Sequence, residues 1–256
     1  MTIALVGDLH GNATRGVAAI EYAFSHGADT IIQLGDFGLW PGWKNSLKPG
    51  YAFLDRLNTK LAALDMDLQW LDGNHEDHGA IAEWISDYGS EAPIAVPGFS
   101  RIHYLPRGYR WTQGGKTFMT IGGAVSVDKQ CRRQGLSWWP EEELTDADVI
   151  NACAGEVDII LAHDCPLGVN IPGIGPDLHH RADSGMSWPY HVLVEAERHR
   201  KKCRTIWEHC KPKMWIHGHY HIPYEYGMRH GEGWTRFIGL GDDCGPLKDN
   251  VHLLEL

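Results

Sequence analysis

Short apolar runs alternate along the chain with longer stretches in which apolar residues recur at helical spacing. The short runs are typical of buried strands and the longer stretches of amphipathic helices. We predict strands at Thr2 to Val6, Thr30 to Leu34, Asp67 to Leu71, Lys116 to Ile121, Asp158 to Leu161, Lys213 to Ile216, Arg236 to Leu240 and Val251 to Leu254. We predict helices at Ala13 to Ser25, Tyr51 to Leu64, His78 to Asp87, Asp146 to Ala154 and Pro189 to Cys210. Strands crossed by helices in this order predict an α/β fold.

The composition is typical of a compact globular protein. The chain has 256 residues, of which 43% are hydrophobic and 22% charged, and this excludes a disordered, collagen-like or coiled-coil protein. No repeat, Ser/Pro-rich linker or charge block divides it, so we predict a single domain over residues 1–256. No apolar run approaches the roughly 20 residues that span a bilayer, and the first residues do not resemble a signal peptide. We therefore expect no membrane association and a cytoplasmic location.

The charge and the cysteine pattern exclude two further classes of protein. The 23 basic and 33 acidic residues give a net charge of −10, which opposes non-specific coating of nucleic acid. We also find no basic stripe with interleaved aromatic residues. The six cysteines form no CxxC pair in a chain too long to be a disulfide scaffold, so we expect them to be reduced.

Polar residues able to bind metal follow directly after several predicted strands. The segments are IALVGDLH, TIIQLGD, LQWLDGNHE, IILAHD and MWIHGHYH. Because ligands of open α/β sheets bind outside the carboxyl ends of the strands, we expect these loops to converge on one cleft. The glycines in these segments, Gly7, Gly35, Gly73 and Gly218, stand where each strand must turn sharply.

The spacing of the donors favours more than one ion. Asp8 and His10 lie two apart, so an extended chain points both side chains to the same side. His219 and His221 are also two apart, about 6 to 7 Å at strand rise. That separation suits ligands of two different ions, since paired catalytic metals lie about 3.5 to 4 Å apart. Further candidates after the other strands are Asp36, Asn74 beside His75, and His163.

Each of these motifs alone is common, but all of them in this order resemble the calcineurin-like metallophosphoesterases. That family includes phosphoprotein phosphatases, cyclic nucleotide phosphodiesterases and Mre-type nucleases, and the resemblance spans Asp8 to His221. It implies a four-layer α/β sandwich of two mixed β-sheets flanked by helices. It also implies one metal held by Asp8, His10, Asp36 and His221, and a second held by Asp36, Asn74, His163 and His219. His75 takes the role of general acid or transition-state donor.

The chemistry of such a site follows from its ligands. Two divalent ions flanking a water lower the pKa of that water enough to supply hydroxide near neutral pH, and they polarise the phosphoryl oxygens under attack. Carboxylate, amide and imidazole ligands without thiolate favour Mn²⁺, Fe²⁺ or Zn²⁺, and we expect Mn²⁺ first. An imidazole such as that of His75 assists the leaving oxygen.

One part of the family pattern is missing. Phosphoprotein phosphatases carry an Asp-Arg pair shortly after the second motif, whereas here Leu39 and Trp40 stand in that place. A monoester dianion gains more from a fixed guanidinium than a diester monoanion, so the missing pair favours diesters. Candidate substrate contacts from other segments are Arg15, Trp40, Arg132 and Arg133, with Arg181 as a further arginine. The segment GGAVSVDKQCRRQGLSWWPEE resembles a loop of small bacterial and phage-encoded members.

Several other residues have two interpretations. Trp40 and Trp43, close behind Asp36, are expected to line the cleft. Trp138 and Trp139 form either an aromatic lid or, as we prefer, packing on the sheet edge. We predict that Glu141 to Glu143 are solvated before a helix capped by Thr145 and Asp148. His217 is expected to be a non-ligand, and His179 and His180, near Asp177, are expected to be solvated.

The sequence thus predicts a phosphoesterase with a dinuclear metal centre. We expect it to hydrolyse small phosphodiesters such as cyclic nucleotides, and monoesters remain open. The alternatives are a phosphoprotein phosphatase and a catalytically silent metal-binding scaffold for a protein partner. The oligomeric state is not predicted.

Overall fold

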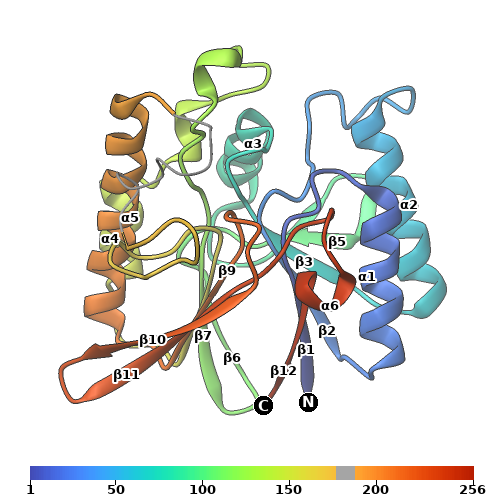
Figure 1. The fold of residues 1–256 in the computed structure, drawn as a ribbon. Helices are drawn as coiled ribbons and strands as arrows, with labels where there is room; N and C mark the ends of the chain where they lie inside the picture. Colours follow the sequence, from blue (N-terminus) through green and yellow to red (C-terminus); the bar gives the residue numbers. More distant parts are fainter. Residues whose placement is uncertain (177–187) are drawn as a thin grey trace.

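Two six-stranded β-sheets lie face to face in the computed structural model, which describes residues 1–176 and 188–256 (Figure 1). The first sheet has the order β12-β1-β2-β3-β5-β4 and the second the order β10-β11-β9-β8-β7-β6. The strands of the first sheet are β1 (Thr2–Val6), β2 (Thr30–Leu34), β3 (Leu68–Leu71), β4 (Ile94–Val96), β5 (Phe99–Tyr104) and β12 (Val251–Glu255). Those of the second are β6 (Arg110–Gln113), β7 (Lys116–Ile121), β8 (Ile159–Ala162), β9 (Met214–His217), β10 (Tyr224–His230) and β11 (Gly233–Gly239).

Helices cover the outer face of each sheet. On one side are α1 (Ala13–Ser25), α2 (Pro49–Leu64) and α3 (His78–Tyr88), and on the other are α4 (Asp146–Ala152) and α5 (Tyr190–Cys210), so that the fold has four layers (Figure 1). A short helix, α6 (Leu247–Asn250), precedes β12, and 3₁₀ turns form at Lys129–Cys131 and Pro140–Glu142. The predicted α/β sandwich of two mixed sheets flanked by helices is confirmed.

Three apolar cores hold the layers together, and the strand pattern explains them. Side chains of a strand alternate between the two faces of its sheet, so Ile3 and Leu5 of β1 point to the core between the sheets, while Ala4 and Val6 point to the helices. From the second sheet, Phe118 and Ile216 close the same central core. Both faces of each central strand are therefore buried, which is why these strands appear in the sequence as continuous apolar runs.

The polar loops gather at one end of the sandwich because neighbouring strands are parallel. β1 pairs in parallel with β2 and β2 with β3, and in the second sheet β7, β8 and β9 are also parallel neighbours. Their carboxyl ends therefore meet at one edge, where the loops after β1 and β2 are joined by the hydrogen bond from Leu9 N to Asp36 O at 3.1 Å.

The predicted elements correspond to those of the structure within about three residues, but four strands were not predicted: β4, β5, β6 and β10. β10, with the sequence YEYGMRH, lies at the edge of its sheet, and its residues alternate between half-buried and exposed. β5 likewise mixes polar residues into an apolar run, and β4 has only three residues. Strands of this kind lack the continuous apolar run that identified the central strands.

Candidate dinuclear metal centre

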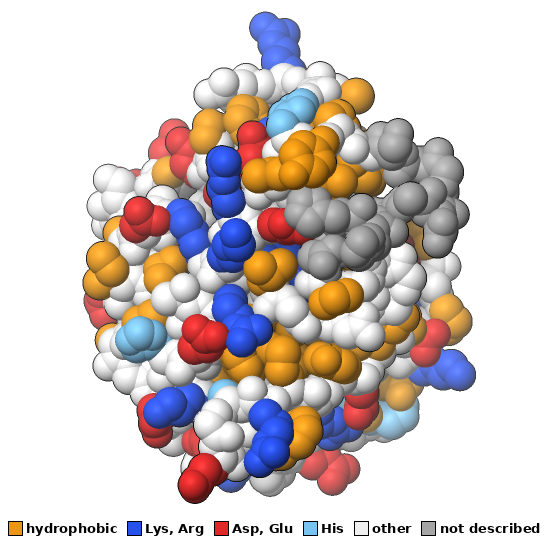
Figure 2. All heavy atoms as spheres, turned by 60° about the vertical axis from the view of Figure 1, so that its left-hand side comes forward, with side chains coloured by type: hydrophobic (Ala, Val, Ile, Leu, Met, Phe, Trp, Pro, Cys, Tyr) orange, Lys and Arg blue, Asp and Glu red, His pale blue; other side chains and the backbone are white. Residues whose placement is uncertain are grey.

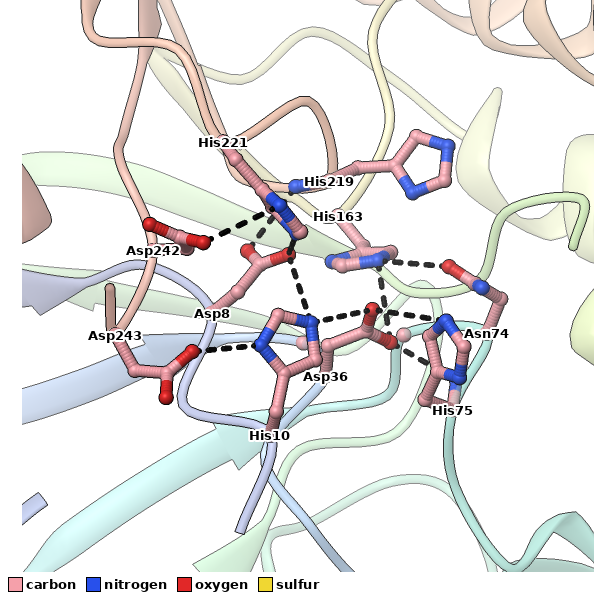
Figure 3. Close-up of polar contacts among 12 residues, drawn as sticks. Asp8, His10, Asp36, Asn74, His75, His163, His219, His221, Asp242 and Asp243 are labelled. Atoms are coloured by element: carbon pink, nitrogen blue, oxygen red, sulfur yellow. Dashed lines mark hydrogen bonds and ion pairs between the residues drawn. The ribbon is translucent and has the colours of Figure 1, made fainter. Parts of the chain in front are cut away.

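The first group of predicted ligands comes from both sheets. Asp8 and His10 follow β1, and His221 follows β9. One ligand atom from each lies within 4.8 Å of the others, and His221 Nε2 is 3.0 Å from Asp8 Oδ2 (Figure 3). Asp8 is fully buried, whereas His10 and His221 are partly open to solvent. These residues could hold one cation at the rim of the cleft.

The second group lies deeper. Asp36 after β2, His163 after β8 and His219 after β9 bring one ligand atom each within 4.8 Å of one another, and Asp36 and His163 are buried. The Oδ1 atom of Asn74 lies 3.1 Å from His163 Nε2, so the amide oxygen faces the same group (Figure 3).

Asp36 lies between the two groups. Its Oδ2 atom is 3.5 Å from His10 Nε2 in the first group, and its Oδ1 atom is 3.4 Å from His163 Nε2 in the second. A carboxylate in this position can present one oxygen to each of two cations. The structure therefore brings all seven predicted ligand residues to one place, in two groups that share Asp36.

The backbone around the site adopts conformations that most residues avoid. His10, Asp36, His219 and His221 all have positive φ, between 44° and 69°. Such strain persists where the surrounding structure enforces it, and it is concentrated at functional sites. The glycines before the ligands serve close approach: a Cβ atom at Gly73 would overlap the Asp36 carboxylate, and one at Gly218 would overlap that of Asp8.

The buried carboxylates of Asp8 and Asp36 require nearby positive charge to remain ionised. Burial alone would lower the pKa of His163, but Asp36 and Asp8 raise it to about 10, and the pKa of His10 is raised to about 10 against the same burial effect. Burial raises the pKa of Asp36, yet the neighbouring imidazoles bring it well below its usual value. Protons on imidazoles thus balance the carboxylates when no cation does. A mixed set of carboxylate, amide and imidazole donors around this charge fits two divalent cations.

His75 stands beside the centre with an arginine next to it. Its backbone N–H donates to Asp36 Oδ1 at 2.9 Å, and the Arg132 guanidinium lies 3.0 Å from its Nε2 atom. Arg132 is itself held by Asp128, whose two carboxylate oxygens each accept a hydrogen bond of 2.8 Å from it. Beside these residues lies a cavity of about 340 Å³, whose walls include Trp40, Pro41, Leu136 and Trp139.

The other predicted substrate contacts are placed differently. The Arg15 guanidinium donates to the backbone carbonyls of Asp243, at 3.0 Å, and Gly245, so it organises a loop. Arg133 is exposed and is not among the residues that line the cavity beside His75. His179 and His180, with Asp177 and Arg181, lie outside the described residues.

Two interpretations of the sequence were wrong. Trp43 does not line the cleft: its side chain is only 2% exposed and packs against Trp84 at 5.2 Å between ring centroids. Glu142 is not solvated but fully buried, although Glu141 beside it is exposed. The capping box of Thr145 with Asp148 is present as predicted.

His217 has partners for both ring nitrogens. Its Nε2 atom is 2.7 Å from the Tyr224 hydroxyl, and its Nδ1 atom is 2.9 Å from the carbonyl of Gly218. The ring is fully buried and belongs to neither group of candidate ligands. This placement agrees with its expected role as a non-ligand.

Two acidic residues that support the histidines were not predicted from the sequence. His10 Nδ1 is 2.9 Å from Asp243 Oδ1, and His221 Nδ1 is 3.4 Å from Asp242 Oδ2 (Figure 3). Such contacts fix the ring and leave Nε2 to face a cation. A signal was present, because the predicted strand Arg236 to Leu240 also runs directly into a Gly-Asp-Asp segment.

Two donor groups at the strand ends of a four-layer α/β sandwich are candidate ligands for two metal ions. A family model, calcineurin-like phosphoesterase, matches residues 1–223. The chain belongs to this family, as the sequence motifs suggested. A comparison with curated proteins finds no match.

Solved structures share the fold at low sequence identity. A dimetal phosphatase from Danio rerio is 14% identical, with a TM-score of 0.59, and the match covers 100% of this chain and 92% of that chain. The protein TT1561 of Thermus thermophilus is 13% identical, with a TM-score of 0.50, and the match covers 94% of this chain and 89% of that one. Both likenesses support the fold of the present chain.

Proposed function

We propose that this protein is a phosphoesterase with two divalent metal ions, most readily Mn²⁺ with Fe and Zn as alternatives, that hydrolyses phosphodiester bonds of small molecules such as cyclic nucleotides. The observation that carries the proposal is the pair of donor groups joined by Asp36. One cation would be held by Asp8, His10, Asp36 and His221, and the other by Asp36, Asn74, His163 and His219. When bound, the two ions supply an activated water and positive charge for the phosphoryl oxygens.

His75 and Arg132, which line the cavity beside the two donor groups, would contact the substrate there. A guanidinium only donates hydrogen bonds, so His75 Nε2 accepts in the present arrangement and the ring is neutral there. A phosphoryl oxygen that takes over the Arg132 hydrogen bond leaves Nε2 free to take up a proton from solvent and pass it to the leaving oxygen. Burial, together with Arg132, lowers the pKa of His75 against the opposing effect of Asp36, and a lower pKa makes a protonated ring the stronger acid.

The cavity beside His75 favours a planar, largely apolar group on the substrate. Trp40 and Trp139 both line it, and aromatic side chains of this kind stack on flat rings such as nucleobases. The position next to His75 is where the group attached to phosphorus would lie. This supports small esters that carry a ring, including cyclic nucleotides.

A second candidate activity, hydrolysis of monoesters including phosphoproteins, is favoured by Arg132. This arginine and Asp128 come from the segment after β7, yet they place a carboxylate-held guanidinium at His75. That is the kind of group whose absence after Asp36 favoured diesters. A fixed guanidinium binds a dianion strongly, so monoesters are the natural competitor in any assay.

The surface around α5 does not favour a nuclease. Lys and Arg side chains on this face are interspersed with Asp and Glu (Figure 2). Lys202 pairs with Asp146 at 3.0 Å and Arg204 with Glu208 at 2.7 Å, so these cations are already balanced by carboxylates. Small esters need no extended basic track.

We place the protein in the cytoplasm as a single domain of residues 1–256. All six cysteines are free, which suits a reducing compartment. No helix among residues 1–176 and 188–256 is long and apolar enough to cross a membrane.

The test combines metal analysis with turnover of chromogenic esters. We expect two Mn²⁺ ions per chain, faster hydrolysis of bis(p-nitrophenyl) phosphate than of p-nitrophenyl phosphate, and loss of turnover in Asp36→Ala and His75→Ala. Faster hydrolysis of the monoester would overturn the diester assignment and support the second candidate. Two bound ions with no hydrolysis of any ester, including cyclic nucleotides and phosphopeptides, would instead indicate a silent scaffold.

A further inference from the structure

A buried carboxylate lies close behind the metal centre. Glu142 belongs to the segment that follows β7, and its side chain is fully buried. Within the described residues it forms no salt bridge, although removing a carboxylate from water costs several kcal/mol unless hydrogen bonds compensate. Both of its oxygens are bound by one residue: Oε1 accepts from Ser126 N at 2.7 Å and Oε2 accepts from Ser126 Oγ at 2.6 Å.

Ser126 connects this carboxylate to a candidate metal ligand. The Ser126 Oγ atom accepts a hydrogen bond of 3.0 Å from Asn74 Nδ2, and Ser126 and Asn74 are also buried. At the other end of the same amide, Asn74 Oδ1 faces His163. A continuous hydrogen-bonded chain therefore runs from Glu142 through Ser126 to Asn74.

Burial raises the pKa of Glu142 to about 7, although the hydrogen bonds from Ser126 oppose this effect, so the carboxylate form prevails above that pH. In that form the hydrogen-bonded chain has only one possible direction. A carboxylate is only an acceptor, so the hydroxyl of Ser126 must donate its single proton to Glu142. The Ser126 oxygen can then only accept from Asn74, and the group that donates must be the amide NH₂. The amide oxygen consequently points the other way, toward His163.

The direction matters because the two ends of an asparagine amide have almost the same shape. Only the oxygen can bind a cation, whereas the NH₂ group presents positive hydrogens to it. Packing alone does not distinguish the two orientations of the amide, but a series of hydrogen bonds that ends on a carboxylate does.

We propose that Glu142, acting through Ser126, fixes the orientation of the Asn74 amide so that its oxygen faces the deeper cation. Glu142 and Ser126 are then positioning residues. The inference rests on the proposed function insofar as Asn74 is a ligand. It assigns to the segment after β7 a role in assembling the metal centre, in addition to the placement of Arg132 beside His75.

The experiment is a calorimetric titration with Mn²⁺ of the metal-free full chain carrying Glu142→Gln or Ser126→Ala, at about pH 8, above the raised pKa of Glu142. Glutamine at position 142 either donates to Ser126 and reverses the chain or sets its NH₂ against Ser126 N–H. We expect one of the two ions to bind about 10- to 100-fold more weakly, the usual effect of losing a partner of a ligand, and the other ion to be little affected. Glu141→Gln, the same change at the exposed neighbouring position, should leave both affinities unchanged.

A double variant separates positioning from a merely structural role. Aspartate at position 74 presents an oxygen in either orientation, and its second oxygen competes with Glu142 for the single Ser126 proton. In the Asn74→Asp background, Glu142→Gln should therefore maintain or improve affinity for the deeper ion. An equal loss of Mn²⁺ affinity on Glu142→Gln in both backgrounds would overturn the proposal. Mn²⁺ affinity of Ser126→Ala within twofold of wild type would also overturn it. If Glu142→Gln does not fold, the Ser126→Ala measurement decides alone. A wild-type chain that binds fewer than two ions would instead refute the proposed function.

Discussion

Removing the Arg132 side chain tests how the protein grips phosphate. In the structure one guanidinium nitrogen is 3.0 Å from His75 Nε2, and the group is held by two hydrogen bonds of 2.8 Å to Asp128. A hydrogen bond to a charged group contributes about 1.5–3 kcal/mol. At 1.4 kcal/mol for each factor of ten, Arg132→Ala should lower kcat/KM by roughly 10- to 150-fold.

The effect should depend on the charge of the substrate. We expect the larger loss for p-nitrophenyl phosphate, a dianion, and the smaller loss for its bis-ester. Arg132→Lys should recover only part of the activity, because an ammonium cannot bind Asp128 in a fork and phosphate at once. Asp128 is 36% exposed, so loss of the pair should change the free energy of unfolding by less than about 1 kcal/mol.

The assay is steady-state kinetics on both esters beside thermal unfolding, with Arg133→Ala as the matched control at the exposed neighbouring position. Arg133→Ala should resemble wild type in all measurements. A kcat/KM of Arg132→Ala within twofold of wild type on both esters, or an equal loss in Arg133→Ala, would show that Arg132 does not bind phosphate.

Three further predictions concern stability, pH and substrate. Arg107→Met breaks a buried pair in which Arg107 donates to Asp72 at 2.6 and 2.9 Å, and it should cost about 3–5 kcal/mol of unfolding free energy in urea. Burial raises the pKa of Asp72, but Arg107 brings it below its usual value. The stabilisation by this pair is therefore full above about pH 3.9 and is lost as the pH falls through the lower pKa of the folded state. Equal unfolding free energies of Arg107→Met and wild type at pH 7 would contradict this prediction. His10 and His163, with pKa values of about 10 without metal, contribute stability that is present below about pH 6.5 and lost as the pH rises through 10. Mn²⁺ must displace these protons, so its affinity should rise from pH 6 to 9 with proton release measurable by calorimetry in two buffers, and a flat profile would be inconsistent with this charge state. Trp139→Ala should raise KM for a cyclic nucleotide more than for methyl p-nitrophenyl phosphate, and equal changes would argue against a ring-binding cavity.

The strand-end residues could be predicted because their geometry is local. Asp8, Asp36 and His163 each follow an apolar run, and the ends of neighbouring parallel strands meet whatever the rest of the chain does. The candidate arginines have no such local constraint. The sequence therefore could not separate Arg132, which lies at the cavity, from Arg15 and Arg133, which do not.

The path of the segment after β7 could not be predicted. It depends on tertiary contacts such as those of Arg107, which donates to the backbone carbonyls of Glu141, Glu142 and Glu143. These contacts lie more than 30 residues apart in the sequence and carry no local pattern. They turn one carboxylate of an acidic run into the interior and leave its neighbour in water, which is why the sequence interpretation of this run failed.

The ligand groups draw on both halves of the sandwich: Asp8, His10, Asp36 and Asn74 follow strands of one sheet, and His163, His219 and His221 follow strands of the other. Neither half alone can bind cations strongly, so ion binding and the joining of the halves favour each other. At an ion concentration of a hundred times Kd this linkage contributes about 2.7 kcal/mol per ion. Removal of the ions by a chelator should therefore weaken the association of the two sheets. The supply of metal would then regulate the lifetime of the folded protein as well as its turnover.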